Sequence, residues 1–258
     1  MRKLLVTLFA VPALVSGTLI VDDPFTDGGV SDGADPLDTA WSSGSAGGTL
    51  SVVDDAAGIG AGNALQRGAD SNFEIVRGNA VATLAGVGTS ISLNFDFRVV
   101  NAPASVNNGF RLGVGNTGNA YVGAMNLGTS PGGTIFYNPN GSTGGAGQVG
   151  FAGQTGSNPA IGDTLAHTAS LSLVRTVSGI DASFSVDGTA PRTGSFASTQ
   201  AGFFEDITRI YIGFGNTNND FRIDNVRLDN TVIPEPGSLA LTLLGSGLLL
   251  RWRKCRIT

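Results

Sequence analysis

The chain has 258 residues, of which 41% are hydrophobic and 39 are glycine. Two short terminal segments hold six of its 15 basic residues, so residues 18–232 carry nine arginines, no lysine and 19 acidic residues, a net charge of −10. Such an acidic segment argues against nucleic acid as a partner, because nucleic-acid binding relies on basic patches. The only cysteine, Cys255, lies close to the C-terminal end, so residues 18–232 form no disulfide.

The first 17 residues have the layout of a secretory signal peptide. Arg2 and Lys3 give a positive start, an apolar run from Leu4 to Leu14 follows, and residues 15–17 are modest or small at the cleavage positions. The apolar run is too short for a stable membrane-spanning helix. We therefore expect a signal helix over 1–17 that is removed on export, followed by one domain over 18–232.

Short stretches of alternating apolar and polar residues run through this domain, separated by turns rich in Gly, Asn, Asp and Ser. The clearest stretch is 91–99, where every second residue is apolar. A period of two is typical of a half-buried strand. Further strands are predicted over 18–22, 49–53, 72–77, 81–84, 109–114, 119–125, 133–137, 167–175, 180–186, 209–214 and 220–228.

No long segment of helical period occurs in 18–232, so the sequence predicts an all-β sandwich or barrel. The segment 138–163 differs from the rest, because it is rich in glycine and poor in apolar residues. We predict a long surface loop there.

From residue 233 the chain reads IPEPGSLALTLLGSGLLLRWRKCRIT. The apolar run 237–250 ends in a basic cluster with one tryptophan, which is a membrane stop-transfer pattern: Arg251, Trp252, Arg253, Lys254 and Arg256. As a helix this run spans only about 21 Å, against about 30 Å for the hydrocarbon core of a bilayer. A short run of this kind favours a hydrophobic helix that is recognised and removed over a permanent anchor.

Pro234-Glu235-Pro236, the apolar run and the terminal basic cluster, in this order, resemble the PEP-CTERM sorting signal of Gram-negative bacteria. The resemblance covers 233–258 and implies processing near Pro-Glu-Pro by an exosortase-type membrane protease. It also implies transient anchoring in the inner membrane and delivery to the cell surface or an exopolysaccharide matrix. It implies nothing about the activity of 18–232, because unrelated domains share such tails. An ordinary single-pass anchor is the alternative.

The strand that begins at His167, the return strand over 180–186 and the turn at Asp187-Gly188 form a hairpin pattern. Together with the closing strand 221–228, this hairpin resembles laminin-G-like and concanavalin-A-like jelly rolls. The resemblance implies an antiparallel two-sheet β-sandwich with one curved sheet.

Aspartates crowd the start of the domain, and hard cations such as Ca²⁺ prefer carboxylate and carbonyl oxygens. In the jelly rolls that the chain resembles, a structural calcium ties the first strand region to the last strand. The resemblance thus implies a Ca²⁺ site formed by Asp22, Asp23 and Asp224. Solvated aspartates that cap turns are the alternative.

Carbohydrate binding uses aromatic faces with planar polar groups beside them. Strand parity sets Arg209 and Tyr211 opposite Ile210 and Ile212, and it likewise sets Tyr121 and Arg111 opposite apolar neighbours. We predict a glycan-binding surface of Arg111, Tyr121, Arg209 and Tyr211. The alternative is that both tyrosines are partly buried sheet residues.

Catalytic residues are not evident in the sequence. Glycoside hydrolysis needs two carboxylates at a set separation, and the only glutamates of the domain, Glu74 and Glu205, do not lie in a Glu-x-Asp-x-x-Glu context. The one histidine, His167, has the position of a structural residue at a strand end. The sequence therefore predicts a non-enzymatic surface or matrix protein that engages polysaccharide. A purely structural matrix protein and a divergent glycoside hydrolase are the alternatives.

Overall fold

The computed structural model describes the strands of residues 16–232 and the turns between many of them. The described residues are 16–31, 37–43, 49–56, 58–59, 62–68, 74–100, 109–116, 121–127, 133–138, 149–158, 161, 163–197, 206–214 and 220–232. The predicted hydrophobic helix of the tail lies outside them, as does the predicted signal helix apart from residues 16 and 17. Those two residues belong to the first strand.

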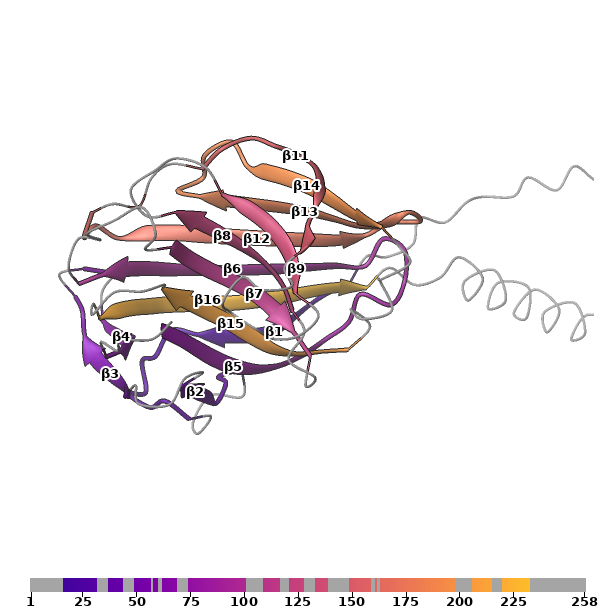
Figure 1. The fold of residues 1–258 in the computed structure, drawn as a ribbon. Helices are drawn as coiled ribbons and strands as arrows, with labels where there is room; N and C mark the ends of the chain where they lie inside the picture. The colour runs from indigo at the N-terminus through magenta and orange to yellow at the C-terminus, as the bar shows by residue number, and fades with distance from the viewer. Residues whose placement is uncertain are drawn as a thin grey trace, which may run out of the picture.

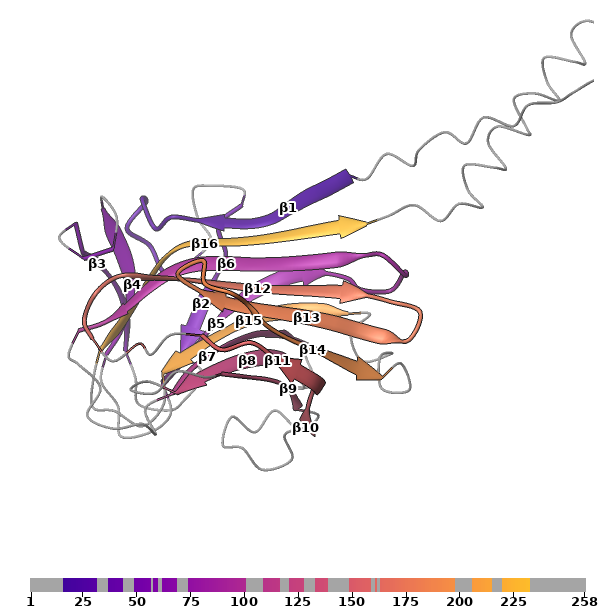
Figure 2. The same cartoon turned by 90° about the horizontal axis from the view of Figure 1, so that it is seen from above.

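Two stacked antiparallel sheets make up the described part of the chain, which contains no helix (Figures 1 and 2). Sheet A has, in spatial order, β11 (Ala152–Thr155), β14 (Arg192–Ala197), β13 (Gly179–Val186), β12 (His167–Arg175), β6 (Ser90–Val99), β16 (Phe221–Val232), β4 (Asn63–Arg67) and β3 (Leu50–Asp54), with β1 (Ser16–Asp23) also paired to β16. Sheet B has β10 (Val149–Gly150), β9 (Thr134–Asn138), β8 (Tyr121–Leu127), β7 (Gly109–Gly115), β15 (Ile207–Phe214), β5 (Glu74–Ala82) and β2 (Trp41–Ser43). The prediction of an all-β antiparallel sandwich is confirmed.

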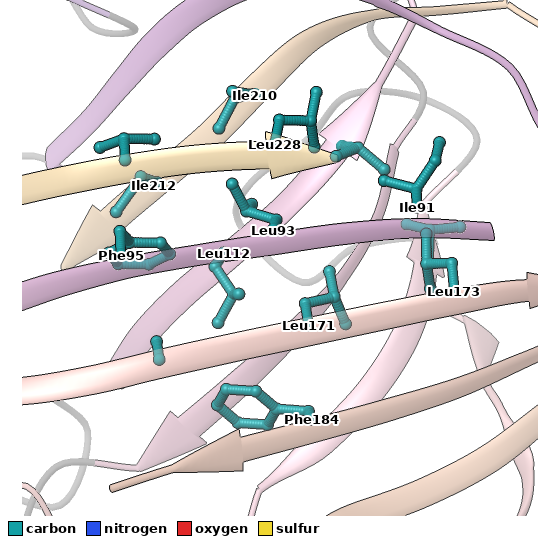
Figure 3. Packing of buried hydrophobic residues seen from close by; sticks show 14 of the residues in the cluster. Ile91, Leu93, Phe95, Leu112, Leu171, Leu173, Phe184, Ile210, Ile212 and Leu228 are labelled. Atoms are coloured by element: carbon teal, nitrogen blue, oxygen red, sulfur yellow. The ribbon is translucent and has the colours of Figure 1, made fainter. Parts of the chain in front are cut away.

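The hydrophobic core lies between the two sheets. Along β6, buried and half-buried residues alternate without a break, as the period of two predicted. Leu93 and Phe184 of sheet A pack toward Leu112 and Ile212 of sheet B (Figure 3). Because each sheet buries one face against the other, the opposite face of each sheet is left for turns, solvent or ligands.

The predicted strands recur with small differences. The predicted strands 72–77 and 81–84 both fall partly in the single strand β5, because Gly78 continues the ladder to β15. The short strands β2, β4 and β14 were not predicted. The prediction of a long surface loop over 138–163 is wrong at β10 and β11, because β10 pairs with β9 and β11 pairs with β14.

Strand β16 organises the edge of sheet A where the described chain begins and ends. It pairs with β6 along its length, with β4 near its start and with β1 over its second half. Ser16 is opposite Val232, so the first and last described residues lie side by side (Figure 2). A bulge follows Asp224, where Asn225 takes a φ of 51°.

Candidate functional site

Arg209 and Tyr211 of β15 lie on the outer face of sheet B, the face turned away from sheet A. Their neighbours Ile210 and Ile212 are fully buried in the core, and successive strand residues point to opposite faces. The alternation of the sequence therefore predicted the orientation of β15.

The other two residues proposed for glycan contact occupy positions on the same face. Residues directly opposite one another on antiparallel strands share a face. Arg209 is opposite Gly115 of β7, and Gly115 is opposite Tyr121 of β8. Arg111 of β7 is opposite Gly213 of β15. The register thus brings all four positions to the outer face of sheet B.

Accessibility differs along this face. Tyr211 keeps only 5% of its surface exposed, and Phe136 of β9 keeps 1%. By contrast, Arg209 is half-buried, and Asn79, opposite it on β5, is exposed. A ring as buried as that of Tyr211 cannot stack on a sugar without local movement. Arg111, at the other end of the face, is also half-buried, but its Nε and Nη1 atoms are buried, so the Arg209 end is the more accessible of the two.

Glycines occupy the centre of the same face, at positions 113, 115, 123 and 213. Gly113 is opposite Gly123, and a Cβ at Gly113 would lie 2.3 Å from the carbonyl oxygen of Val122. The close approach of β7 and β8 therefore requires glycine there. Glycine inside a strand commonly marks a close approach of this kind, by another backbone or by a ligand.

A pocket of about 460 Å³ adjoins the Arg209 end of the face. Its polar lining comes from Asp38, Asn79, Thr208 and Arg209, and its apolar lining includes Ile20 and Val81. This volume lies within the usual range for small-molecule sites, in which a few polar groups converge on a mostly apolar wall. Carboxylate, amide, hydroxyl and guanidinium groups together suit hydrogen bonding to sugar hydroxyls.

The pocket wall is held in place by the chain before β2. Thr39 Oγ1 donates a hydrogen bond of 2.5 Å to the carbonyl oxygen of Asn79. The Asn79 amide donates to the Ala40 carbonyl at 3.4 Å. Thr208 Oγ1, also on the wall, is buried and has no hydrogen-bond partner within the described structure. A buried hydroxyl without a partner is uncommon in folded proteins.

Acidic residues are missing from the strand positions of the outer face of sheet B. The register assigns to this face positions 75, 77 and 79 on β5 and 209, 211 and 213 on β15, together with 111, 113 and 115 on β7, 121, 123 and 125 on β8, and 134, 136 and 138 on β9. None of these is Asp or Glu. Within the described strands, this face therefore lacks the carboxylate pair that glycoside hydrolysis requires.

A second pocket, of about 390 Å³, lies on the outer face of sheet A and was not predicted. Ser172, Ser183 and Thr193 line it and are opposite one another on β12, β13 and β14. The row continues to Ser92 on β6. A sequence signal for this pocket existed, because Ser or Thr recurs at every second position of these strands. The same pattern is also ordinary for a sheet face in contact with solvent.

The three aspartates proposed as calcium ligands come together only in part. Asp22 and Asp23 lie on β1 and Asp224 on β16. The Asp23 carboxylate accepts hydrogen bonds from Trp41 Nε1 at 2.7 Å and from the Phe25 amide at 3.1 Å. Asp23 therefore fastens β2 to β1.

No group of three or more His, Cys, Asp or Glu residues with metal-binding geometry occurs among the described residues. Calcium stays a prediction. Thermal unfolding of the protein with and without a chelator tests it, and an unchanged midpoint would contradict it.

Asp224 has the largest perturbation of acidity among these carboxyl groups. Burial raises its pKa to about 6, and the negative charges of Asp96, Asp23 and Asp55 add to the effect. A hydrogen bond of 2.7 Å from the Asn225 amide acts in the opposite direction. Burial also raises the pKa of Asp23.

His167 is the first residue of β12, the strand end at which the sequence placed it. Its Nδ1 lies 2.8 Å from Asp187 Oδ2, and its Nε2 lies 3.0 Å from Asp163 Oδ1. The ring also packs 5.4 Å from that of Phe97, measured between centroids. These contacts join the start of β12 to the predicted Asp187-Gly188 turn.

The sorting residues Pro234, Glu235 and Pro236 and the basic cluster 251–256 lie outside the described residues. In the part of the chain that the structure does describe, no helix is long and apolar enough to span a membrane.

No protein-family model and no curated protein matches the chain. Solved structures do share its fold. The T. cruzi calreticulin globular domain matches with a TM-score of 0.54 at 12% identity, over 90% of this chain and 94% of that one. An endo-1,3-β-glucanase from Streptomyces sioyaensis matches with a TM-score of 0.51 at 12% identity, over 88% and 100%.

A conserved carbohydrate esterase from the Shiga toxin-encoding bacteriophage phi24B matches with a TM-score of 0.51 at 16% identity, over 83% of this chain and 99% of that one. At such low identities these likenesses establish the fold alone. They agree with the jelly-roll sandwich that the sequence predicted.

Proposed function

We propose that residues 18–232 are a non-catalytic carbohydrate-binding module of an exported surface or matrix protein. The contact surface is the Arg209 end of the outer face of sheet B, with the adjoining pocket. The observation that carries the proposal is the position of Arg209. It is one of the four residues selected from the sequence, and it lines a pocket together with Asn79 and Asp38.

One further observation supports a carbohydrate ligand, and another argues against its hydrolysis. Two of the proteins that share the fold are named a glucanase and a carbohydrate esterase. The outer face of sheet B, in contrast, has no Asp or Glu at its described strand positions. A sugar would be held there by guanidinium and amide groups and by the carboxylate of Asp38, the one acidic residue that lines the pocket. A single carboxylate does not supply the acid and base pair that breaks a glycosidic bond.

A glycan array, followed by titration calorimetry on the best polysaccharide, tests the proposal with the full chain in detergent. Replacing Arg209 with Ala removes charge-assisted hydrogen bonds worth about 1.5–3 kcal/mol, so we expect a roughly 10- to 100-fold weaker Kd. Arg227→Ala is the matched control. Arg227 is 51% exposed on β16 of sheet A and pairs with Asp229.

Three results of this experiment contradict the proposal. Equal losses for the two variants would remove the Arg209 end as the site. If the wild-type chain bound no glycan, the alternative of a purely structural matrix protein would be favoured. The burial of Tyr211 also suits that alternative. Release of reducing sugar from the bound glycan would indicate a hydrolase.

The proposal includes export by the N-terminal segment and sorting by the C-terminal tail. In a host with an exosortase-type protease, we expect the mature protein to lack the signal peptide and to end close to residues 234–236, as measured by intact mass. Replacing Pro234 and Pro236 with Ala should abolish the second cleavage. Pro191→Ala, at an exposed position of the domain, should leave it unchanged.

A further inference from the structure

The two described ends of the chain leave the sandwich at one place. Ser16 and Gly17 of β1 pair with Val232 and Thr231 of β16. The turn between β5 and β6 lies beside them, because Thr231 is also opposite Ser90. We call this part of the molecule, together with the turn between β12 and β13, the terminal end (Figure 2).

Large apolar side chains are exposed at the terminal end. Val177, in the β12–β13 turn, is 84% exposed, Val87, in the β5–β6 turn, is 56% exposed, and Val232 is 42% exposed. The two turns are fastened together, because the Gly88 amide donates to the Arg175 carbonyl at 2.7 Å. The Arg175 amide in turn donates to the Thr89 carbonyl at 2.9 Å. The valines therefore extend from a firm edge of the sandwich.

Charge is distributed very unevenly between the two ends of these strands. Residues 83–90, 174–179 and 230–232 contain a single charged residue, Arg175. Asp181 is opposite Val174, and Asp206 precedes Ile207, which is opposite Ala82. The opposite end of β6, β12 and β16 carries a group of aspartates: Asp96, Asp163, Asp187, Asp220 and Asp224.

The chain beyond Val232 limits how far the terminal end can lie from a membrane. The apolar run of the tail starts at residue 237, five residues after Val232. Five residues span at most about 18 Å when fully extended. If the apolar run enters a bilayer, the exposed valines lie within reach of its interface.

We propose that the terminal end of the sandwich docks on the lipid bilayer through Val87, Val177 and Val232. This docking belongs to the precursor, before its tail is cleaved. It rests on transient insertion of the tail, a step of the sorting in the proposed function, and is independent of glycan binding. Apolar side chains gain free energy by entering the interfacial region. The aspartates of the opposite end are then held away from the negative surface potential of anionic lipids. The domain stands with its β5–β6 and β12–β13 turns toward the membrane.

Site-specific fluorescence on the full chain tests this orientation. The chain's only cysteine is first removed as Cys255→Ser, and a single probe site is then introduced as Val177→Cys or Leu165→Cys. Leu165 is the matched control, because it is 66% exposed and precedes the opposite end of the same strand, β12. Each variant carries an environment-sensitive dye and is reconstituted into phosphatidylcholine vesicles with or without headgroup nitroxide lipid.

We expect the vesicles to float with the protein and the nitroxide to quench the dye at position 177 at least twofold more than at position 165. Val87→Asp should reduce quenching at position 177 and leave flotation unchanged. Flotation with equal quenching at the two positions would overturn docking and leave tail insertion intact. Failure to float would overturn tail insertion, and docking with it. Dye–dye self-quenching at position 177 without lipid would overturn docking in favour of a contact between two copies of this chain.

Discussion

Asp224 is a carboxyl group that the fold protects from water at some cost. The residue is 4% exposed, and this burial, with the charges of three nearby aspartates, raises its pKa to about 6. The folded protein therefore holds a proton on Asp224 more tightly than the unfolded chain, whose carboxyl has a pKa near 3.8. The contribution of this group to the free energy of unfolding is therefore fully present below about pH 3.8 and is lost as the pH rises through 6.

Asp224→Asn removes this titration and keeps an oxygen acceptor for the Asn225 amide. We expect the variant to be more stable than wild type at pH 7, by at most about 3 kcal/mol, and equal to it near pH 4. The measurement is urea unfolding at several pH values, read as the difference between the two proteins. That difference cancels the titration of Asp55, whose pKa is lowered by Arg98 and Arg222 against the effect of its burial. A variant less stable than wild type at pH 7 would indicate that the carboxylate is needed, as in a metal site.

At the scale of single strands, the contact of β7 with β8 depends on a pair of glycines. A methyl group on Gly113 would overlap the Val122 carbonyl, and one on Gly123 would overlap the Leu112 carbonyl, each at 2.3 Å. Backbone atoms cannot move aside as the end of a flexible side chain can. The ladder of sheet B would have to separate locally to accept alanine.

Gly113→Ala is therefore expected to lower the free energy of unfolding by about 2 kcal/mol or more, within the range of overpacking. Gly62→Ala is the control, since nothing lies within 4 Å of a Cβ built there. Thermal unfolding of both variants compares them. Equal midpoints would contradict the close approach of β7 and β8.

The sequence predicted strands well where one face is apolar and buried. β12 was predicted with its observed bounds, because its alternation of polar and apolar residues runs unbroken from Thr168 to Leu173. β10 and β11 were missed because both are exposed edge strands, stabilised by backbone pairing to β9 and β14 rather than by burial. Such pairing leaves no periodic trace in the residues.

The candidate site was predictable to a similar extent. The alternation of residues along β15 was enough to predict that Arg209 and Tyr211 lie on the outer face of sheet B. The burial of Tyr211 was not predictable, because it depends on tertiary packing. The contribution of Asp38 and Asn79 to the Arg209 pocket depends on the chain before β2 crossing to β5, a contact made by Thr39 across 40 residues.

The whole molecule has two different ends and two different faces. Aspartates gather at one end, and exposed valines with a single arginine lie at the other. The Arg209 pocket lies on the flank between them, where β1, β5 and β15 meet the chain before β2. A domain docked by its valines would therefore present the Arg209 pocket sideways, along the membrane surface.

The position of Val232 also decides how the molecule would respond to force. A pull between an inserted tail and a polysaccharide held on sheet B would enter at Val232, the last residue of β16. The tension would run lengthwise along this strand, which is bonded to β6 on one side and to β1 and β4 on the other. Hydrogen-bond ladders loaded along their length must slip over many rungs at once, whereas a ladder pulled from its end opens rung by rung. The arrangement of β16 therefore suits a protein that bears tension between the membrane and its surroundings for as long as its tail is uncleaved.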